Sequence, residues 1–202
     1  MNNLVNFKSF FKFLSRNKTY TAIDIFGLSV SLMFVILIAV YSVQELSTDK
    51  YHAKGDRIYV LSSEANTGSA YKLAYRLQER YPEIEKVCPV APWGFYHTSV
   101  TVADKNFNAE LMFADTTFFD FFSFPLLVGD RNHVMDADGY GVISESFARK
   151  VFSDSDPIGQ VVQVNDSIRI QLNGIMKDIQ NSTIPYCDIL MGIKQLKYME
   201  EG

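Results

Sequence analysis

The sequence predicts an α+β domain preceded by one transmembrane helix and an N-terminal amphipathic helix. Residues 25–44 contain no charged side chain, whereas the chain after residue 46 alternates short helical and strand-like patterns separated by turns. The chain has 202 residues, of which 48% are hydrophobic and 14% aromatic, enough for one folded domain plus an appendage. We therefore divide it into residues 1–20, 21–46 and 47–202.

The uncharged run predicts a membrane-spanning helix over residues 21–46. Its twenty uncharged residues extend about 30 Å as a helix, which is the thickness of the hydrocarbon core of a bilayer. A cleavable signal peptide is the main alternative, but its apolar part is shorter and ends at small residues. Here the run ends in Tyr41, Val43 and Gln44, followed by Glu45, which favours an uncleaved anchor.

The distribution of charge predicts the topology. Residues 1–20 carry four Lys or Arg and no acid, so the rest of the chain sums to −8 against a total of −4. The positive-inside rule then places residues 1–20 in the cytoplasm and residues 47–202 outside it, on the other side of the membrane. The net negative charge of residues 21–202 also argues against nucleic acid as a partner, because phosphate binding needs cations on the folded surface.

Residues 1–20 have the pattern of an amphipathic helix. Apolar side chains recur at spacings of three and four, at Leu4, Phe7, Phe11 and Leu14. Such a helix lies in the plane of the lipid headgroups, with its apolar side buried and its Lys side chains near phosphates. Two alternatives stay open: the segment only fixes the topology, or its apolar face packs against another helix.

The first part of residues 47–202 predicts a β-α-β unit. Residues 57–62 (RIYVLS) are strand-like, and residues 87–91 form a short apolar run that returns as a second strand. Between them, residues 70–81 have helical spacing, with Ser69 as the predicted N-cap and Pro82 as the stop.

The remainder predicts further strands, one helix and an aromatic block. The predicted strands cover residues 98–103, 108–114, 140–143, 160–164 and 167–172. Ser144 is the predicted N-cap of a helix whose buried face includes Phe147 and Val151. Residues 118–124 contain five Phe, which we assign mainly to the core; an exposed contact patch is the alternative for any surplus.

No catalytic, cofactor-binding or metal site is predicted. The sequence contains no Gly-Lys pair and hence no phosphate-binding loop. Gly139 and Gly141 lack the third glycine of a dinucleotide-binding motif. Ser144 stands at a strand-to-helix turn, as in a nucleophile elbow, but without glycines two residues to either side; capping accounts for it.

Residues that ligate metals are scattered along the chain. His52, His97 and His133 have no partner at helical spacing, and we expect them on the surface or in loops. The acid pairs lack the glycine and the distal glutamate of a calcium loop, so we expect solvated turns there. These pairs are Asp136 with Asp138 and Asp154 with Asp156.

The two cysteines, Cys88 and Cys187, would face an oxidising compartment under the predicted topology. They are able to form a disulfide only if the fold brings them together, which the sequence does not reveal. Free buried thiols are the alternative, and both interpretations stay open.

Three parts of the sequence match a known family in order. They are FKSFFKFLSRNKTYTAIDIFGLSVSL, ELSTDKYHAKGDRIYVLSSE and the block that runs from FFDFFSFPLLVGD through GVISESFARKVFSDSDPIGQVVQVN to NGIMKDI. Together they resemble the start of an ABC-transporter permease of the MacB-like/FtsX-like superfamily, of the type common in Bacteroidetes. The resemblance implies a MacB-like periplasmic core domain in residues 47–202, which we expect to be incomplete at its C-terminus.

The resemblance also implies a function. A separate ABC ATPase hydrolyses ATP, and a homodimer or heterodimer of permeases transmits the movement through the bilayer to the periplasmic domains, for export or for mechanical signalling. A periplasmic adaptor or substrate is a further expected partner, and the chain itself is not expected to be an enzyme. Composition and topology alone equally allow a single-pass anchored sensor or binding domain. An anchored hydrolase ranks last, because no nucleophile, base or metal cluster is assembled.

Overall fold

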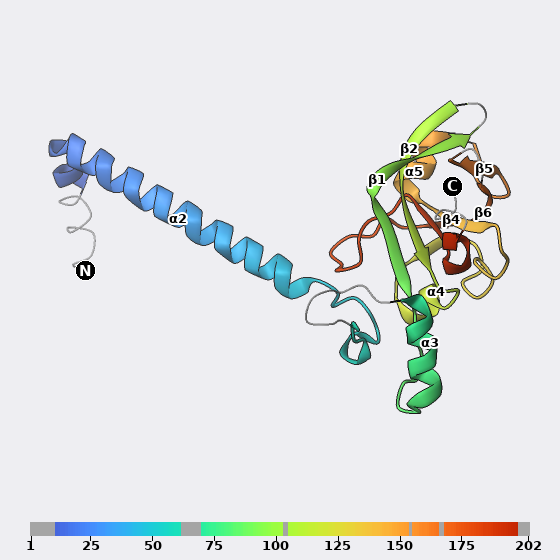
Figure 1. Cartoon of the computed structure of the whole chain (residues 1–202). Helices are drawn as coiled ribbons and strands as arrows, with labels where there is room; N and C mark the ends of the chain where they lie inside the picture. Colours follow the sequence, from blue (N-terminus) through green and yellow to red (C-terminus); the bar gives the residue numbers. More distant parts are fainter. Residues whose placement is uncertain (1–10, 62–69, 103–104, 154, 166–167, 198–202) are drawn as a thin grey trace. The chain divides into compact units, whose positions relative to one another are not determined.

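The computed structural model describes residues 11–61, 70–102, 105–153, 155–165 and 168–197. The chain divides between Thr48 and Asp49 into two compact units. The first unit contains the long helix α2, and the second contains the sheet and the helices that follow α2 in the chain (Figure 1).

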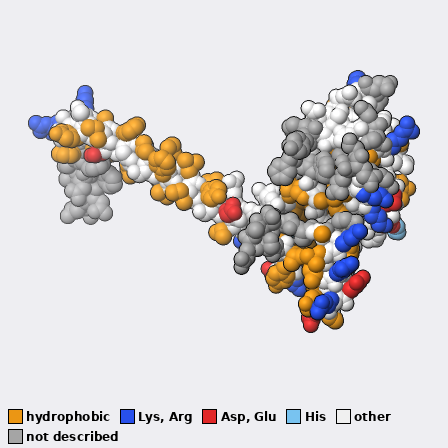
Figure 2. Space-filling view, viewed as in Figure 1, with side chains coloured by type: hydrophobic (Ala, Val, Ile, Leu, Met, Phe, Trp, Pro, Cys, Tyr) orange, Lys and Arg blue, Asp and Glu red, His pale blue; other side chains and the backbone are white. Residues whose placement is uncertain are grey.

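Helix α2 (Lys18–Ser47) is long and apolar enough to cross a membrane. Its 30 residues extend about 45 Å at the rise of an α-helix. Hydrophobic side chains are distributed around the helix, and none of its residues is buried (Figure 2). Residues 11–16 are also helical and are separated from α2 by a break at Asn17. The rest of the predicted amphipathic segment, residues 1–10, lies outside the described residues.

The second unit is built on a seven-stranded mixed sheet in the order β3-β6-β4-β7-β2-β1-β5. The strands are β1 (Val90–Val102), β2 (Lys105–Ala114), β3 (Leu126–Val128), β4 (Tyr140–Ser144), β5 (Val161–Val164), β6 (Ile168–Met176) and β7 (Ile189–Gly192). The pairs β4–β6 and β2–β7 are parallel, and the remaining neighbours are antiparallel. Because β5 also pairs with β6, six strands form a closed ring to which β3 is attached. The pairing of β5 with β6 satisfies backbone groups that an open sheet would leave unpaired at its edge.

Short helices connect these strands. They are η1 (Gly55–Arg57), α3 (Tyr71–Arg80), α4 (Phe118–Phe121), α5 (Glu145–Phe152) and η2 (Ile193–Gln195). The start of α5 is fixed by its cap, since Ser144 Oγ accepts a hydrogen bond from the N–H of Phe147 at 3.3 Å. Phe147 and Ala148 form the buried face of this helix, as predicted.

Two hydrophobic cores lie on opposite faces of the sheet. Successive side chains of a strand point to opposite faces, and in β2 the side chains of Leu111 and Phe113 join one core while Met112 and Ala114 join the other. The second core contains most of the aromatic block, which we define as Phe118, Phe119, Phe121, Phe122 and Phe124. Four of its five side chains are buried, so the prediction that this run mainly fills the core is confirmed.

The predicted strand at residues 57–62 is wrong over its described part. The 3₁₀ helix η1 occupies its start, and residues 58–61 form no strand. The side chains of Tyr59 and Val60 are 85% and 74% exposed. A strand-like pattern becomes a strand only where a neighbouring strand packs and pairs with it, and none of the described strands does so here. The predicted β-α-β unit therefore lacks its first strand.

The other predicted elements are confirmed with shifted ends. The predicted helix at residues 70–81 is α3, but its N-cap is Ala70, which provides no side-chain hydrogen bond, and Ser69 lies outside the described residues. The remaining predicted strands correspond to β1, β2, β4, β5 and β6, and the predicted return strand is the beginning of β1 at Val90. Helix α4 and strands β3 and β7 were not predicted from the sequence.

Candidate functional site

The first residue of the second unit is hydrogen-bonded to a loop 134 positions further along the chain. The N–H of Asp49 donates to the carbonyl oxygen of Asn181 at 2.9 Å. Asp49 Oδ1 accepts from the hydroxyl of Ser182 at 2.6 Å, and Oδ2 accepts from the hydroxyl of Thr183 at 2.7 Å. The N–H of Thr183 lies 3.2 Å from both carboxylate oxygens. We call these four residues the Asp49 clamp.

The clamp favours the ionised form of its carboxylate. Burial alone raises the pKa of Asp49, but the hydrogen bonds from Ser182 and Thr183 and the nearby His52 outweigh burial, so the pKa lies below the usual 3.8. The Asp49 backbone has a φ of 59°, in the left-handed region that Asp adopts more readily than most residues. The chain thus turns sharply at the point where it is first held.

His52 inserts into the second core three residues later. Its side chain is only 3% exposed, and Nδ1 accepts a hydrogen bond from the N–H of Ser123 at 3.1 Å. Its ring centroid lies 5.0 Å from that of Phe124 and 5.4 Å from that of Phe122. Burial lowers the pKa of His52, against the opposing effect of Asp49. The neutral ring therefore connects the clamp to the aromatic block.

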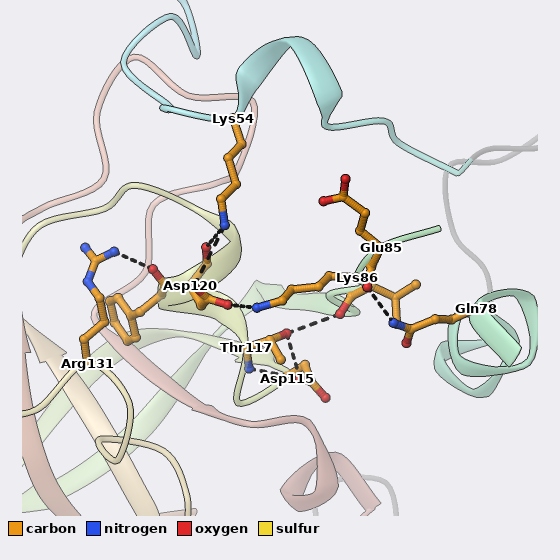
Figure 3. Close-up of polar contacts among 10 residues, drawn as sticks. Lys54, Gln78, Glu85, Lys86, Asp115, Thr117, Asp120 and Arg131 are labelled. Carbon is orange, nitrogen blue, oxygen red and sulfur yellow. Dashed lines mark hydrogen bonds and ion pairs between the residues drawn. The ribbon is translucent and has the colours of Figure 1, made fainter. Parts of the chain in front are cut away.

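A second group of contacts holds the same segment to helix α4. The Lys54 ammonium donates to the carbonyl oxygen of Asp120 at 3.2 Å and lies 3.9 Å from its carboxylate. Lys86 forms an ion pair with the same carboxylate (Figure 3). The hydrogen bond from Lys86, together with its charge and that of Lys54, lowers the pKa of Asp120. Exposed ion pairs contribute little to stability individually, so we assign these contacts mainly to positioning.

Arg131 braces the aromatic block against which this segment rests. Its guanidinium donates to the carbonyl oxygens of Phe119 at 2.6 Å and Phe124 at 2.7 Å. The planar fork of Arg suits two acceptors at once, and both aromatic rings are buried. The residues that follow α2 in the chain are therefore attached to the second unit at several points.

The structure places the three histidines differently from one another. His52 lies in the loop between α2 and η1, which agrees with the predicted surface or loop position, but its side chain is buried against Phe rings and accepts a hydrogen bond from the N–H of Ser123. His133 is exposed, as predicted, and its Nδ1 lies 2.8 Å from Asp130. The side chain of His97 lies outside the described residues. Among the described residues, no three His, Cys, Asp or Glu side chains come together to hold a metal ion.

The described residues of the acid pairs are exposed, and Ser144 caps a helix. Asp136 and Asp138 are exposed, and Asp136 lies 3.9 Å from His133; Asp154 lies outside the described residues. Asp156 accepts a hydrogen bond from the N–H of Ile158 at 2.9 Å, as a turn residue does. Ser144 caps α5 as predicted.

Both cysteines are free in the structure. Cys187 is buried and Cys88 is half-buried. Burial raises the pKa of Cys88 to about 12 and also raises that of Cys187. Of the two interpretations that the sequence left open, the structure has free thiols.

The Asp49 clamp was not predicted from the sequence. Its two halves are more than 130 residues apart, and Asp, Ser and Thr in a polar stretch are normally assigned to solvated turns. The nearest sequence signal was His52 among aromatic residues, which by itself predicts neither burial nor a partner.

Solved structures of permease and transporter domains are similar in fold to this chain. One similar structure is a domain assigned to a permease protein from Porphyromonas gingivalis, with 26% identity and a TM-score of 0.52, covering 60% of this chain and 52% of that one. Another is the periplasmic region of MacB from Actinobacillus actinomycetemcomitans, with 17% identity and a TM-score of 0.51, covering 66% and 60%. The extracellular domain of the noncanonic ABC-type transporter YknZ from Gram-positive bacteria has 14% identity and a TM-score of 0.52, covering 71% and 75%.

Residues 21–200 match the family described as MacB-like periplasmic core domain. The chain therefore belongs to this family. It spans about half of the Porphyromonas domain and three-fifths of the MacB region. A search of curated protein sequences found no match.

Proposed function

We propose that the chain is the N-terminal part of the permease component of an ABC transporter. Residues 1–20 lie in the cytoplasm or at its membrane surface, α2 crosses the inner membrane, and the second unit lies in the periplasm. Family membership, the similarity to permease domains and the cations before α2 support this arrangement. The permease acts as a dimer with a separate ATPase, and the chain itself does not catalyse a reaction.

The Asp49 clamp carries the mechanical part of this proposal. Asp49 comes two residues after the end of α2, and its carboxylate accepts hydrogen bonds from side chains of Ser182 and Thr183. A displacement of α2 therefore reaches the second unit through a short segment that hydrogen bonds hold in place. A flexible linker would absorb the same displacement. ATP-driven movement of the membrane helices is in this way passed on for export or for mechanical signalling.

The test is to loosen the clamp in the reconstituted transporter that contains this chain. Spin labels at an exposed position such as Val161→Cys in two copies report how ATP changes the distance between periplasmic units. We expect Asp49→Ala to reduce this change while ATP hydrolysis persists. The matched control is Asp56→Ala, which removes an exposed carboxylate of the same segment. Equal responses of the two variants would contradict the coupling role.

The topology is tested separately. Protease added to intact spheroplasts should digest the second unit and spare residues 1–20. Deleting residues 1–16 should leave this topology intact but uncouple ATP hydrolysis from transport, if the segment keeps α2 from sliding through the membrane. Protection of the second unit would contradict the proposed orientation. An anchored sensor would show the same topology but would not assemble with an ABC ATPase, which co-purification detects.

A further inference from the structure

Helix α3 is attached to the rest of the second unit through polar side chains. The hydroxyl of Tyr75 donates to the carboxylate of Asp115. Nε2 of Gln78 donates to the carbonyl oxygen of Glu85 at 3.0 Å (Figure 3). None of the described side chains of α3 is buried, whereas α5 buries two of its side chains in a core. Apolar side chains of α3 are therefore left for another contact.

These apolar side chains lie beside a stripe of cations. Lys72, Arg76 and Arg80 are four residues apart, so they share one side of the helix, and all three are exposed. Leu73, in the first turn, and Tyr81, the C-cap, lie next to this stripe and are also exposed. Figure 2 shows cationic side chains beside hydrophobic ones in the region of α3. Cations next to exposed apolar side chains on a helix are typical of binding at a membrane surface.

A second exposed apolar segment begins next to α3. The side chains of Tyr59, Val60 and Leu61 are exposed shortly after η1. Glu85 connects this segment to the helix, since its carboxylate pairs with Arg57 at 2.8 Å and its carbonyl oxygen accepts the hydrogen bond from α3. We call the exposed side chains of residues 59–61, of α3 and of its C-cap the basic apolar surface.

Charge and composition favour an anionic lipid bilayer as the occupant of this surface. Leu, Val and Tyr side chains enter the headgroup region readily, and Lys and Arg are attracted to lipid phosphates. Helix α3 carries three cations against one acid, Glu79, although the chain after residue 20 has a net charge of −8. A second copy of the chain would bring the same cations face to face, which like-charge repulsion opposes.

The bilayer is also close in the chain. Asp49, the first residue of the second unit, comes two residues after α2, and Tyr59 follows ten residues later. A helix inserted in the membrane keeps the attached unit near the lipid at a high effective concentration, so a weak interaction with headgroups is sufficient. This step rests on the membrane insertion of α2 that the proposed function includes.

We propose that the basic apolar surface binds anionic headgroups of the membrane that α2 crosses. Apolar side chains such as Tyr59 and Leu73 enter the headgroup region, and the three cations of α3 contact lipid phosphates. The second unit then has two attachments to the membrane, α2 and this surface.

The test is tryptophan quenching in vesicles made of equal parts of phosphatidylcholine and phosphatidylglycerol, with bromine near the headgroup end of the acyl chains. The full chain is reconstituted with Tyr59→Trp, and the signal of the unaltered chain, which has one Trp, is subtracted. We expect bromine to quench the added Trp, and to quench it less at high salt or in phosphatidylcholine alone. The control Val161→Trp, at an exposed position of β5, should not be quenched.

The role of the cations is tested in the Tyr59→Trp chain by adding Lys72→Gln, Arg76→Gln and Arg80→Gln. One cation near an anionic bilayer changes binding about fivefold, so we expect the quenching to fall by about fivefold or more. The matched control removes three exposed cations elsewhere in the second unit: Arg169→Gln, Lys177→Gln and Lys194→Gln. It should leave the quenching unchanged, and circular dichroism shows whether both sets fold. If the α3 set does not fold, the lipid and salt dependence still decide the question.

Tyr41→Trp in α2 separates this inference from the insertion of α2. Quenching at residue 41 but not at residue 59 overturns the lipid contact and leaves the proposed topology intact, whereas absence of quenching at both contradicts the insertion itself. Equal quenching at residues 59 and 161, or no effect of removing the three cations, also overturns the inference. Shielding of residue 59 that depends on protein density instead of lipid type would indicate a second copy as the occupant and overturn it as well.

Discussion

Nε2 of His52 lies 3.6 Å from Oδ1 of Asp49 and has no hydrogen-bond partner among the described residues, although the ring is almost fully buried. Because Nδ1 accepts from the N–H of Ser123, the proton of the neutral ring is on Nε2 and faces the Asp49 carboxylate. The pair is therefore close enough to interact electrostatically but too far apart for a hydrogen bond. It sits where the chain enters the second unit.

We predict that stability falls as the pH drops below about 6.5, the ordinary pKa of His. The pKa of His52 is lower in the folded protein than in the unfolded chain, so the unfolded chain binds more protons in this range. Asp49 acts only at lower pH: its lowered pKa gives stability above 3.8 that is lost as the pH falls below that value. Thermal unfolding between pH 5 and 8 measures the first effect.

His52→Asn should flatten this pH dependence, because Asn keeps an acceptor for the N–H of Ser123 but does not titrate. The control is His133→Asn. Asp130 raises the pKa of the exposed His133, so its contribution is present below 6.5 and is lost as the pH rises through its folded pKa, the opposite sign. An unchanged pH dependence in the His52 variant would show that other groups cause the loss of stability.

Asp49→Ala should destabilise the folded second unit by about 1–2 kcal/mol. The variant loses charge-assisted hydrogen bonds from Ser182 and Thr183, and the magnitude is kept low because 31% of the side chain is exposed. Denaturant titration of the full chain in detergent measures the change. Asp56→Ala, which lacks such bonds, should stay within about 0.5 kcal/mol of the unaltered chain. A comparable loss in both variants would mean that the clamp adds no stability.

The local sequence pattern was sufficient to predict the elements whose ends and buried faces depend on nearby residues. Ser144 as the cap of α5 and the strand over residues 167–172 depend on neighbours within a few positions, and both predictions are confirmed. In that strand, β6, the side chains of Ile168, Ile170 and Leu172 share the buried face. The strand predicted at residues 57–62 had an equally good pattern. It failed because a strand also needs a partner edge, which depends on the arrangement of the whole sheet.

The candidate site could not be predicted from local sequence pattern either. The Asp49 clamp unites residues more than 130 positions apart. Such a set of residues forms no spacing that a sequence motif could reveal. The burial of His52 is likewise a consequence of where the aromatic block lies in the fold.

The aromatic block should dominate the stability of the second core. Phe118 is fully buried and stacks on Phe124 with ring centroids 5.4 Å apart. We expect Phe118→Ala to cost about 3–5 kcal/mol, through lost burial and the cavity left behind. Phe121 is only half-buried, and Phe121→Ala should cost about 1–2 kcal/mol. Denaturant unfolding measures both values, and equal losses would contradict the packing described for this block.

Both thiols should resist modification in the folded protein. Only the thiolate reacts with disulfide reagents, and burial raises the pKa of Cys88 to about 12 and also raises that of Cys187. At pH 8 a thiol reagent such as Ellman's should therefore label the native chain slowly and label two thiols per chain once denaturant is added. Protein purified from membranes without reductant gives the decisive measurement. Fewer than two reactive thiols after unfolding would mean that the cysteines had formed a disulfide, and rapid labelling of the native chain would mean that the second core opens at Cys88.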